Sequence, residues 1–265
     1  NQVGISLSQN YGKRSKINLD LMRQNTQRMG DKYKLNTYTL INETDFDFSK
    51  LSLGLSTTDD KDLSKAKNIK HTDVFTQWQG LVIDNEISFG ARVIDHDKFS
   101  SHTTYNFNWA RDLNANLRIN GSYGTATNLP NHWSNNAAIV AKVISLKPER
   151  SKNIEFGLSG NYEWGNSEFK VYKSKLTDAF VWCFCSPGYY SNGGTLSIEG
   201  VEISFGTDLL GWNLNTNLDF VEAIDTSTNK EQGRRPKRSI SVNLSKTSGK
   251  WSRNINWTAK SRAWD

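Results

Sequence analysis

The chain has 265 residues, a net charge of +6, a mean hydropathy of −0.64 and 36% hydrophobic residues. Its aromatic content of 11% excludes an intrinsically disordered protein, because disordered chains lack the aromatic and β-branched residues that build a core. No run of about 18 apolar residues occurs, which excludes a transmembrane helix but not a membrane barrel, whose strands alternate apolar and polar residues.

Apolar residues recur at every second position along the whole chain, which is the period of a β-strand with one apolar face. No segment shows the i, i+3, i+4 apolar stripe of an amphipathic helix. The pattern predicts about 14 strands, many of them near the roughly 9–11 residues that a tilted membrane strand needs. In chain order, the alternating positions include Val3, Ile5, Leu7; Ile17, Leu19, Leu21; Leu51, Leu53, Leu55; Ile87, Phe89, Ala91, Val93; Tyr105, Phe107, Trp109; Leu117, Ile119, Tyr123; Ile154, Phe156, Leu158, Tyr162; Val201, Ile203, Phe205; Trp212, Leu214, Leu218; Ile240, Val242, Leu244; and Ile255, Trp257.

The predicted connections between these strands alternate between short and long. The short ones are expected at Asn10–Ser15, Asp45–Lys50, Asp84–Glu86, Arg111–Asn114, Gly165–Ser167, Leu210–Gly211 and Ser248–Lys250. The long ones are expected at Gln24–Lys34, Thr58–His71, Asp95–His102, Thr127–Ser151, Trp182–Leu196 and Asp225–Pro236. Outer-membrane barrels sort their loops in this way, with short periplasmic turns and long extracellular loops. The alternative from the pattern alone is a soluble β-rich binding module, such as a lectin-like sandwich.

Four segments, taken together and in this order, resemble the later barrel strands of TonB-dependent outer-membrane receptors. They are SYGTATNLPN at Ser122–Asn131, LKPERSKNIE at Leu146–Glu155, IEGVE at Ile198–Glu202 and RRPKRSISVNL at Arg234–Leu244. The resemblance covers about residues 100–265 and is strongest to the cobalamin (vitamin B12) receptor subgroup. The motifs are specific for the superfamily and do not identify the substrate.

The resemblance implies an all-β fold, an antiparallel transmembrane β-barrel of which this chain supplies about 14 of about 22 strands. Residues 1–265 are then expected to be a single β-barrel domain fragment without the plug domain and without the C-terminal closing strands. The expected location is the outer membrane of a Gram-negative bacterium. The implied function is active uptake of a scarce nutrient, with cobalamin as the first candidate. The implied partners are the TonB complex, contacted through the missing plug, a corrinoid ligand and outer-membrane lipid, around a monomeric receptor without a cofactor.

Three other functions remain open at this point. The chain could belong to a siderophore or haem receptor of the same superfamily, to a passive porin-like barrel, or to the soluble binding module described above. An enzyme is not expected, because the sequence has no G-x-S-x-G, P-loop or H-E-x-x-H motif. The basic stretch at Arg234, Arg235, Lys237 and Arg238 is interpreted as a solvated loop and strand end rather than a nucleic-acid site.

Aromatic residues of the predicted extracellular loops are the candidate ligand contacts. They are Trp133, Trp182, Phe184, Tyr189 and Tyr190. Such rings can cover a large flat ligand, or they can pack on neighbouring loops instead. Four residues of the family motifs are expected to be mainly structural: Pro148 and Glu149 at a strand start, and Gly200 and Glu202 on one face of a later strand, where Glu202 would pair with a basic residue.

The remaining chemically active residues are not expected to form a site. Cys183 and Cys185 are interpreted as two free thiols or a turn disulfide, without a metal. The acidic group Asp59, Asp60 and Asp62 is interpreted as a solvated loop, since a hard cation needs about six to eight oxygen ligands. All four histidines, at positions 71, 96, 102 and 132, are predicted to lie on the surface of the extracellular loops.

Overall fold

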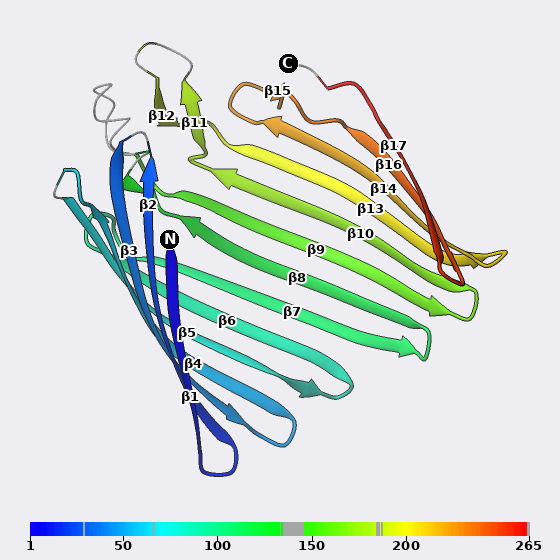
Figure 1. Ribbon diagram of the computed structural model, residues 1–265, viewed down its shortest axis with the longest axis horizontal. Coiled ribbons are helices and arrows are strands. Elements are labelled where there is room, and N and C mark those ends of the chain that lie inside the picture. Colours follow the sequence, from blue (N-terminus) through cyan, green and yellow to red (C-terminus); the bar gives the residue numbers. More distant parts are fainter. Residues whose placement is uncertain are drawn as a thin grey trace. The chain divides into compact units, whose positions relative to one another are not determined.

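The computed structural model describes residues 1–28, 30–65, 67–132, 134, 146–183, 186 and 188–263. Nearly all of these residues lie in β-strands (Figure 1). The strands are β1 Gln2–Tyr11, β2 Ser15–Arg28, β3 Asp31–Asp45, β4 Ser49–Asp62, β5 Lys67–Val82, β6 Asn85–His96, β7 His102–Asn114, β8 Leu117–Asn128, β9 Glu149–Tyr162, β10 Gly165–Thr177, β11 Phe180–Cys183, β12 Tyr189–Asn192, β13 Leu196–Leu209, β14 Trp212–Asp225, β15 Lys230–Glu231, β16 Arg238–Ser248 and β17 Trp251–Lys260. Within the described ranges, no helix has the length and apolar character needed to cross a bilayer.

Fourteen strands pair with their neighbours in chain order to form one continuous sheet, from β1 through β10 and then β13, β14, β16 and β17. The short strand β15 pairs with β14, and β11 pairs with β12 in a separate hairpin. Antiparallel pairing of consecutive strands needs only local connections. The number and order of the main strands confirm the prediction made from period-two alternation.

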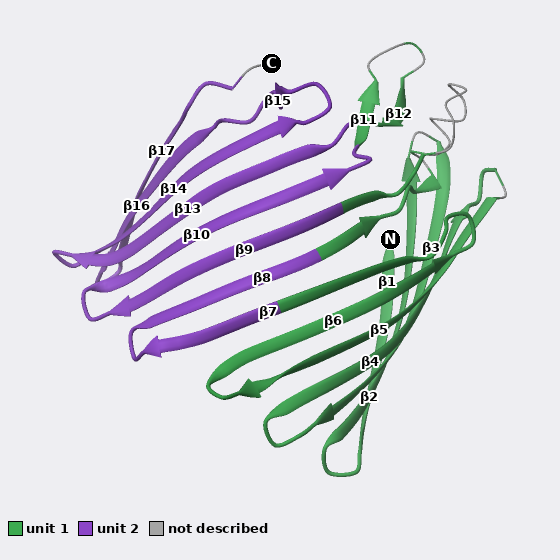
Figure 2. Cartoon of the chain, turned by 180° about the vertical axis from the view of Figure 1, so that it is seen from behind, with its two compact units in different colours: residues 1–107, 125–150, 180–193 green, residues 108–124, 151–179, 194–265 purple. Residues whose placement is uncertain are grey.

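The chain divides into two compact units, which are coloured separately in Figure 2. Unit 1 contains residues 1–107, 125–150 and 180–193, and unit 2 contains residues 108–124, 151–179 and 194–265. Each unit is described by itself below. The single-domain organisation expected for residues 1–265 stays a prediction.

In unit 1 the strand register aligns apolar side chains into transverse rows on one face. One such row contains Leu7, Leu19, Leu40, Leu55, Val74 and Val93, one residue from each of β1 to β6. The side chains of Leu7, Leu40 and Val74 are exposed. A continuous row of exposed aliphatic side chains is unfavourable in water and favourable against lipid. We call this the outer face, and the opposite one the inner face.

Unit 2 has the same two-faced construction. Its outer face carries the row Phe169, Ile203, Leu218, Ile240 and Ala259. The adjacent inner-face row contains Lys170, Glu202, Asp219, Ser239 and Lys260. Apolar and polar rows therefore alternate with the pleat, as a barrel with a lipid-facing exterior and a wet interior requires.

Several strands extend further than the sequence predicts. The expected long connection Gln24–Lys34 is mostly strand, because β2 continues to Arg28 and β3 begins at Asp31. The expected connection Thr58–His71 is likewise shortened by β4 and β5. Backbone hydrogen bonds continue the ladder where the side chains of both faces are polar, so hydrophobic alternation ends before the strand does. The β2–β3 and β4–β5 connections lie at one end of the sheet, which we call the long-loop end. We call the opposite end the short-turn end.

Two short turns hold apolar residues in the left-handed backbone region. Ile83 and Asp84 have φ of 48° and 60°, and Leu210 and Gly211 have φ of 52° and 75°. Positive φ at both central residues matches the twist of a two-residue hairpin. A β-branched residue such as Ile83 is strained there, since its Cβ approaches the following carbonyl oxygen.

Replacing Ile83 by Asn is therefore expected to stabilise the folded protein by about 1 kcal/mol, because Asn tolerates the left-handed region and the 85% exposed Ile83 side chain loses little packing. Urea unfolding of the full-length protein in lipid vesicles would measure the change. Val82→Asn, one position earlier and inside a strand, serves as the control and should not stabilise. An unchanged unfolding midpoint for Ile83→Asn would show that the turn is unstrained.

Candidate functional site

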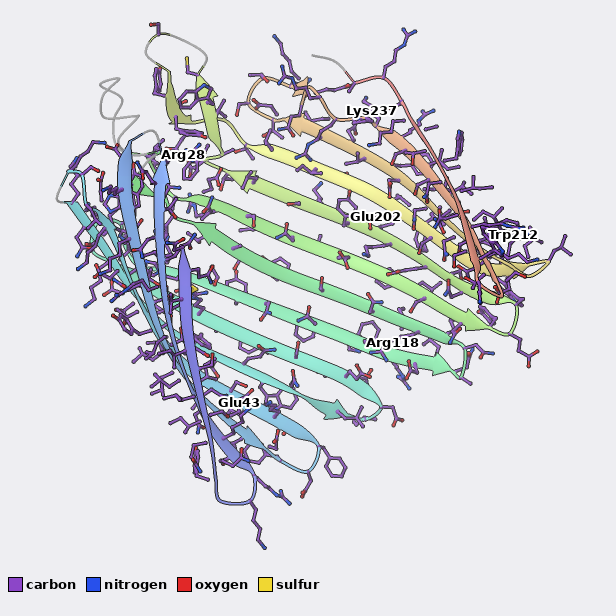
Figure 3. The ribbon with its side chains drawn as sticks, in the orientation of Figure 1. Arg28, Glu43, Arg118, Glu202, Trp212 and Lys237 are labelled. Carbon is purple, nitrogen blue, oxygen red and sulfur yellow. The ribbon has the colours of Figure 1, made fainter. Side chains whose placement is uncertain are left out.

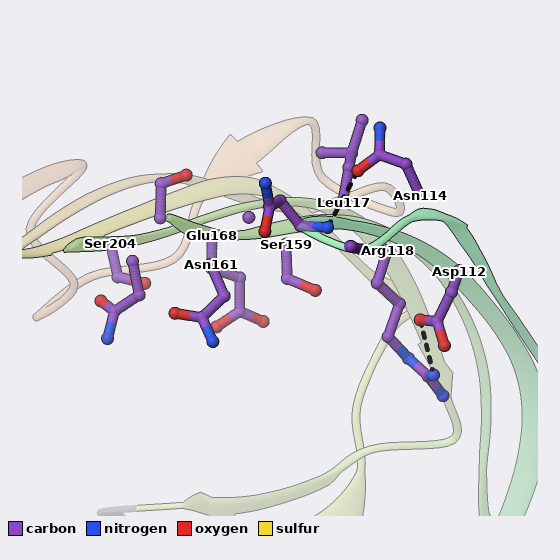
Figure 4. A pocket seen from close by; sticks show the side chains of 13 residues that line it. Asp112, Asn114, Leu117, Arg118, Ser159, Asn161, Glu168 and Ser204 are labelled. Atoms are coloured by element: carbon purple, nitrogen blue, oxygen red, sulfur yellow. Dashed lines mark hydrogen bonds and ion pairs between the residues drawn. The ribbon is translucent and has the colours of Figure 1, made fainter. Parts of the chain in front are cut away.

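A polar cavity of about 470 Å³ lies in unit 2 at the short-turn end. Its inner-face lining includes Asp112, Arg118, Ser159 and Asn161, and Arg118 Nη1 lies 3.1 Å from Asp112 Oδ1. In Figure 4 the side chains of Arg118, Ser159 and Asn161 project to one side of the sheet and Leu117 lies on the other. Small-molecule pockets are mostly apolar with a few polar groups. This cavity is instead lined mainly by residues with hydrogen-bonding side chains.

The IEGVE motif, Ile198–Glu202, contributes to another part of the inner face of unit 2. Lys170 Nζ lies 3.5 Å from Glu202 Oε2, and the Ser239 hydroxyl donates a hydrogen bond to Asp219 Oδ2. The ring of Tyr172 occupies the space that a side chain at Gly200 would need. Glu202 is labelled in Figure 3. The structure thus places Gly200 and Glu202 on one face, with a lysine beside the glutamate, and the role of these residues stays a prediction.

At the long-loop end of unit 1, a second cavity of about 200 Å³ opens on the inner face. It is lined by side chains that include Arg28, Tyr33, Leu35 and His132, and Arg28 is labelled in Figure 3. His132 Nε2 lies 2.8 Å from the carbonyl oxygen of Asp60 and must donate the hydrogen bond, since a carbonyl only accepts. His132 is 3% exposed, so the prediction of a surface histidine is wrong here. The start of the β8–β9 connection therefore packs on the inner face.

Glu149, the first residue of β9, holds three segments together. One carboxylate oxygen accepts a hydrogen bond from the Asn128 side chain at 2.6 Å, and the other accepts one from the backbone N–H of Phe180. The neighbouring Lys147 exchanges two hydrogen bonds with the Asn192 side chain, at 2.7 and 2.9 Å. These contacts attach the hairpin β11–β12 to the ends of β8 and β9. Pro148 directly precedes the strand, where its missing N–H interrupts no ladder.

Three of the five predicted ligand-contacting aromatics lie on the hairpin β11–β12. Trp182 and Tyr190 are direct cross-strand partners, and their ring centroids lie 4.9 Å apart in an edge-to-face arrangement. Tyr189 lies opposite Cys183. Trp133 and Phe184 lie outside the described residues. The structure therefore brings Trp182 and Tyr190 together, and ligand contact by any of the five stays a prediction.

The first interpretation of the cysteines, two free thiols, is wrong. Cys183 is disulfide-bonded at the end of β11. The other cysteine, Cys185, lies outside the described residues. A disulfide constrains the chain beside the aromatic pair of the hairpin.

The expected acidic loop is also corrected, because Asp59, Asp60 and Asp62 lie at the end of strand β4. Asp62 is 1% exposed, and its Oδ1 accepts hydrogen bonds from two backbone N–H groups of the connection that follows. Its carboxylate thus closes the turn after the strand. In the part of the chain that the structure describes, no group of three or more His, Cys, Asp or Glu side chains is arranged to hold a metal ion.

His96 is a second histidine that the structure buries. Its Nδ1 accepts hydrogen bonds from the backbone N–H groups of Lys98 and Phe99, at 2.9 and 3.2 Å, and its ring stacks on His71 with 5.9 Å between centroids. His96 is the last residue of β6 and lies beyond the apolar rows. Burial lowers the pKa of His96, against the opposing effect of the Asp97 carboxylate. A neutral ring is what its two acceptor contacts require.

The sequence alone does not indicate an ion pair on the inner face of unit 1 that joins a buried carboxylate to a half-exposed arginine. Asp73 is 1% exposed, Arg92 Nη2 pairs with its Oδ2, and His71 Nε2 lies 3.9 Å from the same oxygen. Alternation could have placed Asp73 on the polar face, since Val74 next to it lies in the apolar row. Its partner depends on the β5–β6 register, which places Arg92 opposite Phe75, two residues along from Asp73.

Comparison with known protein families gives one match that spans the chain. Residues 2–265 match the family described as TonB dependent receptor-like, beta-barrel. Among curated proteins, the vitamin B12 transporter BtuB of Photobacterium profundum is 24% identical over an alignment of 196 residues, which covers 69% of this chain and 31% of that protein.

Solved structures show the same fold. The ferric enterobactin receptor PfeA of Pseudomonas aeruginosa, in complex with enterobactin, superposes with a TM-score of 0.79 at 13% identity, over 99% of this chain and 49% of that one. The siderophore receptor PirA of Pseudomonas aeruginosa gives a TM-score of 0.77 at 16% identity, over 99% and 53%. The copper transporter OprC gives 0.72 at 14% identity, over 97% and 51%. The chain thus spans about half of each of these structures.

Proposed function

The chain belongs to the TonB-dependent receptor-like β-barrel family of the Gram-negative outer membrane, and we propose that it is the barrel wall of a receptor that takes up a scarce nutrient. The family match over residues 2–265 carries this proposal. The exposed apolar rows of the outer face and the polar rows of the inner face support it physically, because they fit a barrel with lipid outside and water or a plug domain inside. Such a protein is a transporter and not an enzyme.

Cobalamin is the proposed ligand. The support is the similarity to a vitamin B12 transporter, which covers 69% of this chain. The long-loop end, which is extracellular in such a barrel, offers the aromatic pair Trp182 and Tyr190 for contact with a large ring system. All matched residues are barrel, so contact with TonB is proposed to run through other parts of the receptor.

A ferric siderophore is the second candidate ligand. The structures of the siderophore receptors PirA and PfeA match the fold over 99% of the chain. At 16% and 13% identity these matches report the fold and leave the ligand open. A passive porin is a weaker candidate, because its function requires neither a plug nor TonB, whereas the family match is to receptors that depend on TonB.

Binding to the full-length receptor tests the proposal. Purified receptor in detergent should bind cobalamin with a Kd below about 1 μM, which corresponds to about −8 kcal/mol, and should bind ferric enterobactin much more weakly. In cells, cobalamin uptake should stop when TonB is deleted. Tighter binding of ferric enterobactin than of cobalamin would indicate a siderophore as the ligand instead. Uptake that continues without TonB would contradict active transport.

A further inference from the structure

The outer face of unit 1 carries two rows of mainly basic and amide side chains at its long-loop end. The first row contains Arg23, Asn36, Asp59 and Lys70, and the second contains Asn25, Lys34, Lys61 and Asn68. Each row has one residue from each of β2 to β5, so the eight side chains form one continuous patch. We call it the basic patch.

The basic patch is separated from the apolar rows that face lipid by one mixed row of apolar and polar side chains. The next row toward the short-turn end contains Leu21, Tyr38, Thr57 and Thr72, and the row after that contains Leu19, Leu40, Leu55 and Val74. Rows on one face repeat every second residue, about 7 Å along a strand. The cations therefore lie about 7–14 Å beyond the last mixed row, at the height where lipid headgroups follow the hydrocarbon.

Positive charge is in excess within the patch. Arg23, Lys34, Lys61 and Lys70 are four cations, and Asp59 is the one carboxylate in the two rows. Asp59 Oδ2 pairs with Lys61 Nζ at 2.9 Å. Arg23 Nε donates to the Asn36 side-chain oxygen at 3.0 Å, a neutral partner that leaves its charge uncompensated.

The flanking strand β6 and the residue that follows it bring two acids near the edge of the patch. Asp95 faces outward opposite Thr72, and the Asp97 carboxylate accepts a hydrogen bond from the backbone N–H of Lys70 at 3.0 Å. Neither acid pairs with any of the four cations in the described ranges. The excess charge thus remains on β2 to β5.

The corresponding outer-face row of unit 2 is different. Lys173, Glu199 and Glu222 form the first fully charged row beyond its apolar rows, and Lys173 pairs with Glu199. Lys237 lies 3.9 Å from the Glu222 carboxylate. The single lysine of this row in unit 2 is therefore matched by carboxylates, so the row has no excess of positive charge.

We infer that the basic patch binds the phosphate groups of lipopolysaccharide in the outer leaflet. In such a lipid the phosphates sit directly above the acyl chains. The chains would then lie against the apolar rows of the outer face, and the phosphates would lie at the four cations. Arg and Lys bind phosphate through charge-assisted hydrogen bonds, and a cluster of cations beside a membrane attracts anionic headgroups. Arg23 and Lys70 are exposed and can reach such a headgroup.

Lipid binding by the full-length receptor in detergent with EDTA tests this inference. Native mass spectrometry would compare bisphosphorylated lipid A with the same lipid after phosphatase treatment. The wild-type receptor should bind the phosphorylated form at least about tenfold more tightly. The variant Arg23→Gln/Lys34→Gln/Lys61→Gln/Lys70→Gln should lose that preference. Lys173→Gln removes an outward cation that is already paired with a glutamate. This variant should keep the preference for the phosphorylated lipid.

Three results would overturn the inference. They are equal binding of both lipid forms by the wild type, an unchanged preference in the fourfold variant, and displacement of lipid A by millimolar inorganic phosphate, which would indicate a site for free phosphate. If the fourfold variant fails to fold, the wild-type comparison between the two lipid forms still decides. This experiment does not measure cobalamin binding. The proposed function is therefore tested separately, by the binding and uptake of cobalamin.

Discussion

Replacing Arg92 by Met is expected to destabilise the barrel by about 3 kcal/mol. The change would remove the arginine partner of the Asp73 carboxylate, which is 1% exposed, and leave His71 Nε2 at 3.9 Å from Oδ2, while Oδ1 has no hydrogen-bond partner among the described residues. A buried carboxylate that loses its arginine is costly because water does not solvate it. Urea unfolding of the full-length protein in lipid vesicles, followed by tryptophan fluorescence, would measure the loss.

A double variant separates the charge from the shape of the side chains. Asp73→Asn combined with Arg92→Met removes both charges and should recover at least half of the stability that Arg92→Met alone loses. Strictly additive losses in the two single variants would show that the side chains do not interact. Lys50→Met is a matched control, because Lys50 pairs with Glu43 at 2.9 Å and this carboxylate, unlike that of Asp73, stays partly exposed, so its cost should be about 1 kcal/mol or less.

Replacing Trp182 by Ala is expected to weaken cobalamin binding by the full-length receptor at least tenfold. Truncation of a large aromatic ring at a binding hot spot costs about 2 kcal/mol or more, because the ring supplies much contact area with little conformational entropy. Trp182 is suited to this role because Tyr190 holds its ring from across the hairpin. Isothermal titration calorimetry would give both dissociation constants. The prediction rests on the proposed function.

The control distinguishes ligand contact from a general effect of removing tryptophan. Trp251 is 73% exposed at the start of β17, at the short-turn end, so Trp251→Ala should leave cobalamin binding unchanged. Trp182→Phe keeps a ring and should keep most of the affinity. Wild-type affinity in Trp182→Ala would remove Trp182 from the ligand site, although the receptor would still bind cobalamin.

Part of the candidate site could be predicted from the sequence. The alternation around Ile198–Glu202 places Gly200 and Glu202 on one face, and the structure has them there beside Tyr172 and Lys170. The hairpin that carries Trp182 and Tyr190 was expected only as a loop, because its two strands have four residues each and show no clear alternation. Its attachment through Glu149 joins residues far apart in the chain, which no local pattern indicates.

The sequence by itself determined the number and order of the main strands and which face of each is apolar, because the period of two belongs to the backbone and lipid selects the apolar side. The tertiary structure decided where the strands end and which side chains meet. Arg92 reaches Asp73, and Arg23, Lys34, Lys61 and Lys70 form one patch, only through the register of neighbouring strands. Register depends on the pairing of whole strands, and a slip of one residue would exchange the two faces.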